Sequence, residues 1–385
     1  MDFIKEVICR LENHIVSENY AGYDPYDALS SPIFKLPILR SNKLVRFGVQ
    51  QLFRRIPINL RPILKIKKAV NPVTLGLCIQ AYGYLLKIFP EKYDYYISEI
   101  NKLLNWLINL SSKGYSGYCW GYNFDWEARY ARINAFTPTV VATGIITNGL
   151  YEYYKITGDK RIEDIIVSSS YFVLKNLNRT YEGETFCFSY SPNDNQQVFN
   201  ATMKGARLLV QAYKLTNDKE YLKEAEKTVK FVINNQNPDG SWYYSKGDAR
   251  KWVDNFHTAY ILDCLKSFIA HLKKESYNKY LINGLDYYIK NLFTEKFYPK
   301  YYNVSFYPID STEVAQAIIT LSNFNLINEA KAILEFGIKK LFHYRNFKYQ
   351  IRKYYSINIP YMRWSNASWF CSLCFYLNKI NSQTI

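Results

Sequence analysis

The chain has 385 residues and a formal net charge of +16, from 49 Lys and Arg against 33 Asp and Glu. No stretch approaches the roughly 18 apolar residues that a membrane-spanning helix needs. No Gly/Ser/Pro-rich linker divides the sequence, so one domain over residues 1–385 is expected. No recognisable nucleic-acid-binding module accompanies the positive charge, and nucleic acid is therefore not an expected partner.

Cysteine usage and the first residues bear on the cellular compartment. The seven Cys residues, an odd number at scattered positions, argue for reduced thiols rather than a disulfide framework. Residues Met1 to Leu11 carry charges every few positions and hold no long apolar run, so a secretory signal is not expected. A cytoplasmic location follows as the default prediction.

The first predicted elements are a helix at about 2–18 and a basic excursion at about 30–70. From Lys35 to Lys68 the excursion holds ten basic residues and no Asp or Glu, interleaved with Leu, Ile, Val and Phe. Such a segment can lie on an anionic membrane surface or meet a phosphorylated lipid carrier, which would make the protein membrane-peripheral. The alternative is a basic segment that wraps the domain without membrane contact.

Helices then repeat along the rest of the chain. The segment YKITGDK at 154–160 is echoed by YKLTNDK at 213–219. Each copy runs into an amphipathic segment, and the closing signatures of these segments are similar: FVLKNL, FVINNQ and, once more, YYIKNL. The unit returns about every 60 residues with apolar positions at helical spacing, which indicates two helices per unit.

Two sets of helices alternate. One set is rich in Ala, Gly, Ser, Thr and Leu, as helices packed on all sides should be: about 73–88, 139–156, 200–215, 255–271, 311–323 and 362–379. The other set carries Lys and Glu on one face and should face solvent: about 91–110, 159–178, 219–236, 276–293 and 327–342. With helix 2–18 as the sixth outer member, the sequence predicts an all-α (α/α)6 toroid of six helical hairpins rather than an open solenoid.

The connections from outer to inner helices are long, whereas those from inner to outer helices are short. The long loops, in which short β-like segments are expected, should all open at one end: 19–72, 111–138, 179–199, 237–254, 294–310 and 343–361. They concentrate aromatic residues beside Asp, Asn, Arg and His. This mixture suits a sugar ring, whose C–H face stacks on an aromatic ring while its hydroxyls need polar partners. The alternative is that Tyr and Trp simply plug this end of the toroid.

The candidate catalytic residues are Asp254, His257, Asp125 and Asp310. Asp254 and His257 are three residues apart in the first turn of an inner helix, so they share a face on which the carboxylate can orient the imidazole for acid/base work. Asp254 and Asp310 are also placed as helix N-caps, and a capping role alone is the alternative for both. No cofactor or metal is expected. Cys264 lies about 10 Å along the helix from His257, so one zinc ion cannot bind both residues.

The candidate substrate-binding residues belong to the same loops: Tyr23, Asp24, Trp120, Trp126, Arg129, Asp194, Asn195, Trp242, Tyr244, Tyr302, Arg363 and Trp364. Arginines near the rim suggest an anionic sugar such as a uronate, since guanidinium pairs bidentately with carboxylate. These arginines are Arg129, Arg132, Arg250 and Arg363.

Eight motifs carry a resemblance to known proteins: GYDPYDAL, CWGYNFDW, TPTV at 137–140, SYSPNDNQQVFNA, QNPDGSWYY, WVDNFHT, FYPIDSTEVAQ and IPYMRWSNA. In this order the chain resembles, over nearly its full length, the six-hairpin toroid proteins encoded beside polysaccharide-biosynthesis genes in bacteria and archaea. The resemblance implies processing of a cell-surface polysaccharide precursor, with a saccharide or lipid-linked saccharide as partner. More distantly the chain is similar to six-hairpin glycosidases, unsaturated glucuronyl hydrolases, uronate lyases and sugar 2-epimerases. None of their catalytic signatures maps onto this sequence, so hydrolysis, β-elimination and epimerisation all stay open.

Two other classes of function remain as alternatives. Gln236-x-x-x-Gly240-x-Trp242 fits the glutamine-tryptophan repeat of terpene cyclases, and Asp310 to Glu313 loosely resembles their protonating carboxylate motif. A single such repeat is weak evidence, and the polar rim does not suit an apolar terpene. The third class is a non-catalytic glycan-binding or assembly protein.

Overall fold

The computed structural model of the protein describes residues 2–128 and 132–382, and its helices form a closed ring. The inner helices are α4 (Pro72–Ile88), α6 (Val140–Thr157), α8 (Phe199–Thr216), α10 (Asn255–Leu272), α12 (Ser311–Asn323) and α14 (Ser368–Asn381). The outer helices are α1 (Asp2–Ser17), α5 (Tyr93–Asn109), α7 (Lys160–Asn176), α9 (Lys219–Asn234), α11 (Asn278–Asn291) and α13 (Ile327–Leu341). Within the described residues, no helix combines the length and apolar character needed to cross a membrane.

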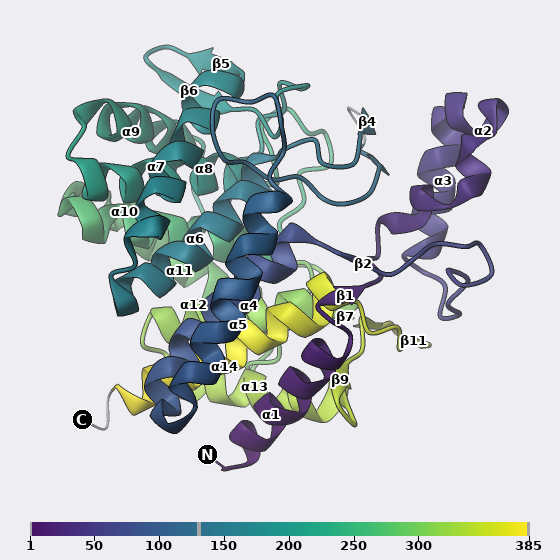
Figure 1. Cartoon of the computed structure of the whole chain (residues 1–385). Coiled ribbons are helices and arrows are strands. Elements are labelled where there is room, and N and C mark those ends of the chain that lie inside the picture. The colour runs from purple at the N-terminus through teal and green to yellow at the C-terminus, as the bar shows by residue number, and fades with distance from the viewer. Residues whose placement is uncertain (1, 129–131, 383–385) are drawn as a thin grey trace.

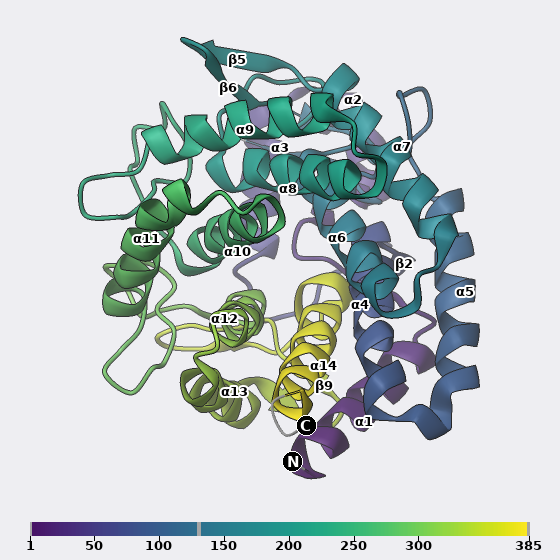
Figure 2. The ribbon, with the colours of Figure 1, turned by 90° about the vertical axis from the view of Figure 1, so that its left-hand side faces the viewer.

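Contacts between the inner helices close the ring. Each inner helix contacts the next one along the chain, and α14 contacts α4. Figure 2 shows the ring seen down its central axis, with the outer helices arranged around the inner ones. Helix α1 packs against α14 and supplies the outer partner that the last inner helix would otherwise lack. The predicted (α/α)6 toroid is therefore confirmed.

The repeated turns explain where the helices of two hairpins end and begin. Gly158 (φ +69°) and Asn217 (φ +60°) adopt the left-handed conformation that ends α6 and α8. Asp159 and Asp218 follow at once, and each carboxylate accepts a backbone N–H from the first turn of the next outer helix. The Thr-Gly-Asp and Thr-Asn-Asp sequences thus combine a helix stop and a helix start in three residues.

Short strands occupy the long loops, as expected. The two-stranded sheets are β1 (Ala21–Gly22) with β2 (Ala69–Val70), β3 (Trp126–Glu127) with β4 (Arg132–Ile133), β5 (Arg179–Glu182) with β6 (Thr185–Phe188), and β8 (Phe342–His343) with β9 (Asn346–Phe347). A three-stranded antiparallel sheet has the order β11 (Ser356–Ile357), β10 (Gln350–Ile351), β7 (Ile309–Asp310). Each two-stranded sheet joins two parts of one loop, and the three-stranded sheet joins the fifth long loop to the last through β7 and β10.

Short helical turns depart from the predicted pattern. A 3-10 turn precedes α5 and another precedes α11, so both outer helices begin two residues later than predicted: η3 (Pro90–Lys92) and η4 (Glu275–Tyr277). The last inner helix starts as a π-helical segment, η5 (Met362–Ala367), before α14. Such widened turns often occur at functional sites. Here the segment carries Arg363 and Trp364.

The basic excursion is helical and projects from the ring. Its base is closed by the antiparallel pair β1 and β2, and it contains η1 (Asp27–Ser30), η2 (Pro32–Lys35), α2 (Pro37–Ser41) and α3 (Lys43–Phe53). Figure 1 shows α2 and α3 standing away from the other helices. The sequence pattern did not predict these helices, because four prolines interrupt the excursion and many of its apolar residues are exposed.

Glycines let inner helices approach closely. A Cβ at Gly149 of α6 would lie 2.4 Å from the carbonyl oxygen of Gly76 on α4. A Cβ at Gly76 would lie 2.9 Å from the Cα of Ile146. Both contacts are with backbone atoms that cannot rotate away, so the crossing of α4 and α6 depends on the missing side chains.

We expect Gly149→Ala to lower the free energy of unfolding by about 1–3 kcal/mol, because the added methyl group overpacks the α4–α6 crossing. The matched control is Gly48→Ala in α3, where an added Cβ meets nothing within 4 Å. That substitution should raise stability by about 0.4–1 kcal/mol by restricting the unfolded chain. Chemical denaturation of the three proteins measures both values, and equal effects at the two glycines would contradict the close crossing.

Candidate active site

A cavity of about 490 Å³ lies at the end of the ring where the long loops meet. Its walls combine loop residues with residues from the first turns of inner helices. Every long loop contributes to the lining: Tyr26 and Arg54, Tyr122 and Trp126, Tyr190 and Gln196, Tyr244 and Trp252, Tyr301 and Tyr302, and Gln350 and Arg352. The predicted convergence of the six loops is therefore observed.

His257 lines the cavity and is held by Asp254. The Asp254 carboxylate accepts the backbone N–H of His257 at 2.8 Å through Oδ1 and contacts the His257 ring nitrogen Nδ1 at 2.5 Å through Oδ2. Asp254 is buried, whereas the His257 side chain is 20% exposed. One carboxylate thus caps α10 and fixes the imidazole. The contact leaves Nε2 as the ring nitrogen that can meet a substrate.

Aromatic rings surround this imidazole. The ring centroids of Tyr244, Trp252 and Phe256 lie 4.7, 5.6 and 4.0 Å from that of His257. Tyr244 and Trp252 stack on each other at 4.6 Å, and Tyr302 meets Trp252 edge to face. These rings restrict the imidazole and give the cavity a flat aromatic wall.

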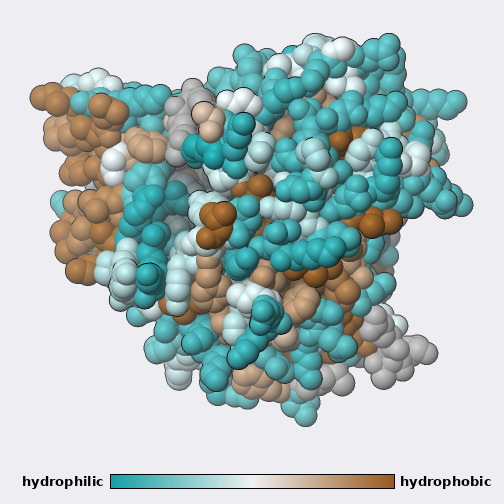
Figure 3. All heavy atoms as spheres, turned by 180° about the vertical axis from the view of Figure 1, so that it is seen from behind, coloured by the Kyte–Doolittle hydropathy of each residue, from teal (hydrophilic) through white to brown (hydrophobic). Residues whose placement is uncertain are grey.

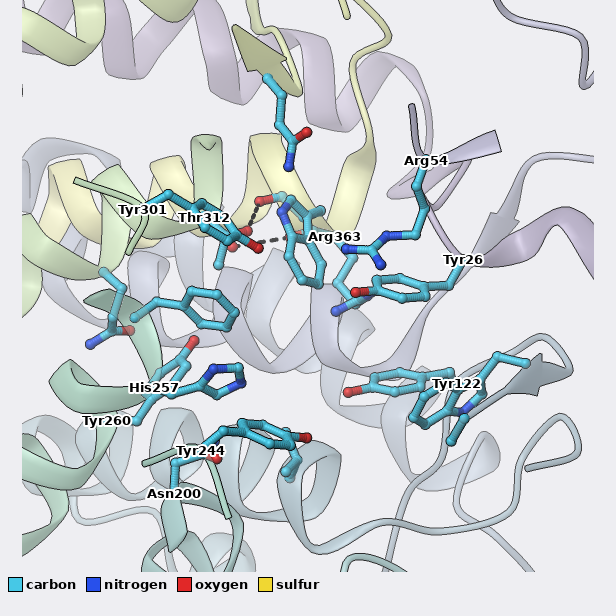
Figure 4. A pocket seen from close by; sticks show the side chains of 18 of the residues that line it. Tyr26, Arg54, Tyr122, Asn200, Tyr244, His257, Tyr260, Tyr301, Thr312 and Arg363 are labelled. Atoms are coloured by element: carbon cyan, nitrogen blue, oxygen red, sulfur yellow. Dashed lines mark hydrogen bonds between the residues drawn. The ribbon is translucent and has the colours of Figure 1, made fainter. Parts of the chain in front are cut away.

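A cationic wall faces the imidazole. Figure 4 shows His257, Tyr244 and Tyr260 on one side of the cavity, with Arg54 and Tyr26 on the other. The guanidinium of Arg54 lies 4.3 Å from the centre of the Tyr26 ring. Burial opposes the Arg54 charge, but the surrounding tyrosines outweigh it and raise its pKa. Arg54 therefore stays charged inside the cavity.

Arg352 adds a second cation to this wall. Among the described residues, its side chain donates a hydrogen bond to the neutral amide of Gln350, at 2.9 Å. No salt bridge between described residues involves Arg54 or Arg352. Both guanidinium groups can therefore receive an anionic ligand.

The arginines that the sequence singled out near the mouth are already paired where the structure describes them. Arg363, on the π-helical segment, makes a bidentate pair with buried Asp24 at 2.6 and 2.9 Å. Burial opposes the Arg363 charge, and the Asp24 carboxylate outweighs it and raises the pKa of Arg363. Arg132 pairs with Asp125, and Arg250 pairs with Asp248. Arg129 lies outside the described residues.

The structure separates the predicted catalytic carboxylates. Asp125 lines a second cavity of about 520 Å³ with Lys35, Arg40 and Arg132 rather than the first one. Asp310 is fully buried and caps α12, and it accepts hydrogen bonds from Gln350 and Trp364. Neither carboxylate is placed beside His257, so of the four candidate catalytic residues the structure brings only Asp254 and His257 into contact.

Several predicted substrate-binding residues lie elsewhere. Trp120 and Trp242 are buried, and their indole N–H groups donate to carbonyls of the outer helices α5 and α9, at Leu107 and Val232. Asp194 organises its own loop by accepting bonds from three nearby backbone N–H groups. Tyr23 and Asn195 are likewise outside the cavity lining, whereas Trp126, Tyr244, Tyr302, Arg363 and Trp364 are part of it.

Other lining residues were not predicted from the sequence: Tyr26, Arg54, Tyr122, Tyr190, Asn200, Trp252, Tyr260, Tyr301, Thr312, Gln316 and Arg352. Two of them, Asn200 and Thr312, belong to first turns of inner helices, and this position in the sequence could have identified them. Arg54 and Arg352 had no such signal, because they reach the cavity through the excursion and the last loop.

Two buried ionisable groups lie beneath the cavity. The Lys204 Nζ sits 3.1 Å from the centre of the Tyr260 ring and has no hydrogen-bond partner among the described residues. Burial lowers the pKa of Lys204 to about 7. Burial, with Asp310 and Asp254 nearby, raises the pKa of Glu313 well above its usual range. Among the residues that the structure places, no group of three or more His, Cys, Asp or Glu could hold a metal ion.

The fold is shared with structurally characterised carbohydrate enzymes. No protein-family model matches the chain, and neither does any curated protein sequence. Cellobiose 2-epimerase from Bacillus thermoamylovorans B4167 is similar in structure, with a TM-score of 0.64 and 9% identity over 82% of this chain and 90% of that one. An unsaturated glucuronyl hydrolase specific for heparin gives a TM-score of 0.59 and 13% identity over 83% and 89% of the two chains. A family 76 glycoside hydrolase from a bovine Bacteroides thetaiotaomicron strain gives 0.58 and 13% over 81% and 69%.

These likenesses define the class of fold. They confirm the predicted similarity to six-hairpin glycosidase-like toroids, and at these identities they establish the fold alone. The resemblance to proteins encoded beside polysaccharide-biosynthesis genes stays a prediction, since no family model supports it.

We expect Lys204→Met to raise the free energy of unfolding at pH 7 by about 1–3 kcal/mol, because it removes a buried amine without a hydrogen-bond partner and keeps its volume. The folded protein binds the Lys204 proton less tightly than the unfolded chain does. The free energy of unfolding of the wild type should therefore rise relative to that of the variant as pH increases from about 7 towards the lysine pKa of about 10.4 in the unfolded chain. Denaturant unfolding at both ends of this range measures the change. A variant that is less stable at pH 7 would show that the amine has a favourable partner.

Proposed function

We propose that the protein is an enzyme that processes a carbohydrate and that its substrate is an anionic saccharide bound in the 490 Å³ cavity. The observation that carries the proposal is the imidazole of His257, held by Asp254 on an aromatic wall and facing the cations Arg54 and Arg352. The similar structures support it, because their names describe epimerases, isomerases and hydrolases of sugars.

The aromatic wall suits the apolar face of a pyranose ring. Tyr244 and Trp252 stack as a flat surface beside His257. Gln196, Asn200 and Gln316 supply amide groups to the same lining, and amides can both donate to and accept from sugar hydroxyls. Stacking and bidentate hydrogen bonding together are what recognition of a sugar requires.

The cationic wall favours a carboxylate on that sugar. Arg54 and Arg352 have only neutral partners among the described residues, and a planar guanidinium matches a carboxylate in geometry. Of the arginines singled out in the sequence, Arg132, Arg250 and Arg363 are engaged by Asp125, Asp248 and Asp24. A uronate would therefore be bound by the two arginines that the sequence pattern missed.

The donor set favours abstraction of a carbon-bound proton. With Nδ1 against the Asp254 carboxylate, the neutral imidazole carries its proton there and presents basic Nε2 to the substrate. Glycoside hydrolysis ordinarily uses two carboxyl groups. The described lining offers Glu127, which is already paired with Arg46 at 2.7 Å. We therefore place epimerisation or β-elimination, both of which remove a proton next to a carbonyl or carboxylate, ahead of hydrolysis.

The biological setting follows from the sequence resemblance. Cell-surface polysaccharide biosynthesis, a lipid-linked form of the saccharide and a cytoplasmic location are consistent with the proposed site and stay predictions. A non-catalytic glycan-binding role would use the same aromatic wall but would not need the contact between Asp254 and His257.

Proton abstraction can be followed without knowing the product. The probes are disaccharides that contain glucuronic or galacturonic acid, each with its neutral glucose or galactose counterpart, incubated with the protein in D2O. We expect deuterium to enter an acidic probe at one ring carbon, as seen by NMR. Loss of the ring proton with formation of a double bond identifies elimination, and inversion at the same carbon identifies epimerisation.

Asp254→Asn should cut the rate of deuterium incorporation by about 10²-fold or more, the usual scale for loss of acid/base catalysis. The melting temperature should change little, because Asn caps a helix about as well as Asp. His257→Gln should lose the same activity. The control Asp159→Asn caps an outer helix away from the cavity and should leave the rate unchanged. Full activity in Asp254→Asn would leave Asp254 as a cap alone.

Arg54→Gln should weaken binding of an acidic disaccharide by about 10-fold or more, since hydrogen bonds to charged groups contribute about 1.5–3 kcal/mol. Binding of the neutral counterpart should not change. The control Arg10→Gln removes an exposed arginine on α1. Isothermal titration of both sugars into the three proteins gives the result, and equal weakening for acidic and neutral sugars would contradict recognition of the carboxylate.

A further inference from the structure

The excursion turns apolar side chains outward. Seven large aliphatic residues on it are exposed: Ile33, Leu36, Ile38, Leu44, Leu52, Ile58 and Ile63, with Ile38 at 81%, Leu44 at 82% and Ile63 at 75%. Leu44 and Leu52 are eight residues apart on α3 and so share one face of the helix. Figure 3 shows hydrophobic residues gathered on the projecting α2–α3 region. We call this set of seven residues the apolar face.

The opposite side of the excursion is polar and tightly held. Arg46 on α3 pairs with Glu127, and Gln50 exchanges two hydrogen bonds with the Glu127 backbone, at 2.9 and 3.1 Å. Arg61 is fully buried and donates to Asp27 at 2.7 Å. Helix α3 therefore buries Arg46 and Gln50 beside Phe53, and it leaves the aliphatic side chains of Leu44 and Leu52 exposed.

The inner side of α3 also forms part of the cavity wall. Phe47, Gln50, Gln51 and Arg54 line the cavity from this helix. Whatever covers the apolar face is therefore separated from the cavity by the thickness of one helix.

Charge identifies what covers the apolar face. No Asp or Glu occurs between Ala28 and Pro90, and exposed basic residues flank the apolar face: Lys35, Arg40, Arg55, Lys65 and Lys67. A second copy of the chain seated face to face would bring these like charges together. A bilayer with acidic lipids offers an apolar interior to the aliphatic side chains and anionic headgroups to the basic residues around them, so it suits both parts of this surface.

We propose that the α2–α3 excursion docks on an anionic lipid bilayer, with its apolar face in the headgroup region and α3 between the membrane and the cavity. The cavity mouth then lies beside the membrane surface, where a saccharide carried on a lipid would be presented. That form of substrate rests on the proposed function, whereas docking does not.

Sedimentation with vesicles tests the docking. The full chain should bind anionic vesicles, made of phosphatidylcholine mixed with phosphatidylglycerol, at least about 10-fold more tightly than it binds vesicles of phosphatidylcholine alone, because the excursion is positively charged. Binding should weaken as salt rises, because charges are screened over about 8 Å at physiological ionic strength. Equal recovery with neutral and anionic vesicles would overturn the proposal.

Two triple variants locate the contact. Lys35→Glu with Arg40→Glu and Lys67→Glu, and separately Ile38→Ser with Leu44→Ser and Ile63→Ser, should each reduce vesicle binding by about 10-fold or more. The charge control is Lys223→Glu with Lys290→Glu and Lys331→Glu on outer helices, where these lysines are exposed. The apolar control is Ile282→Ser with Val304→Ser, at positions 58% and 87% exposed. Binding that falls equally in variants and controls would overturn the assignment to the excursion.

The serine variant also separates docking from catalysis and from self-association. Its activity on a soluble disaccharide should match that of the wild type, since none of the three residues lines the cavity. Sedimentation velocity without lipid should give the same mass for both proteins. A wild-type dimer that the serine variant abolishes would overturn the membrane assignment in favour of a second copy.

Discussion

Closure of the helical ring is the constraint on which the rest of the structure depends. Once α14 packs against α4, all six inner helices point their N-termini at the same end, and the six long loops must meet there. First-turn residues then face a shared space, as His257, Asn200 and Thr312 do. The cavity is therefore a consequence of the repeat, whereas its chemistry depends on which loop residues turn inward.

Buried ion pairs decide how the loops cover this end. Three pairs hold the first long loop. Arg61 with Asp27 lies within that loop, Arg46 with Glu127 connects it to the second loop, and Arg363 with Asp24 connects it to the last inner helix. Removing one partner would leave an unpaired buried charge, which is far more costly than losing an exposed pair. This arrangement makes the excursion a fixed part of the cavity and leaves Arg54 as a charged group directed into it.

Much of the fold was predictable because it depends on local rules. Apolar periodicity located the helices, and the Thr-Gly-Asp turns fixed their ends. Spacing of three residues also placed Asp254 beside His257. Which loop residues face the cavity was not predictable. In a loop that enters an inner helix, some side chains point into the cavity and others point towards the outer helices, as Trp120 and Trp242 do. Arg54 was missed because its position depends on the pairing of Arg46 with Glu127, two residues that lie some 80 positions apart in the sequence.

A crystal structure with a bound glucuronic-acid disaccharide tests the central claim most directly. The account predicts a pyranose ring against Tyr244 and Trp252, its carboxylate within hydrogen-bond reach of Arg54 or Arg352, and a ring carbon close to Nε2 of His257. A disaccharide bound outside this cavity, or inside it with the carboxylate turned away from both arginines, would contradict the account.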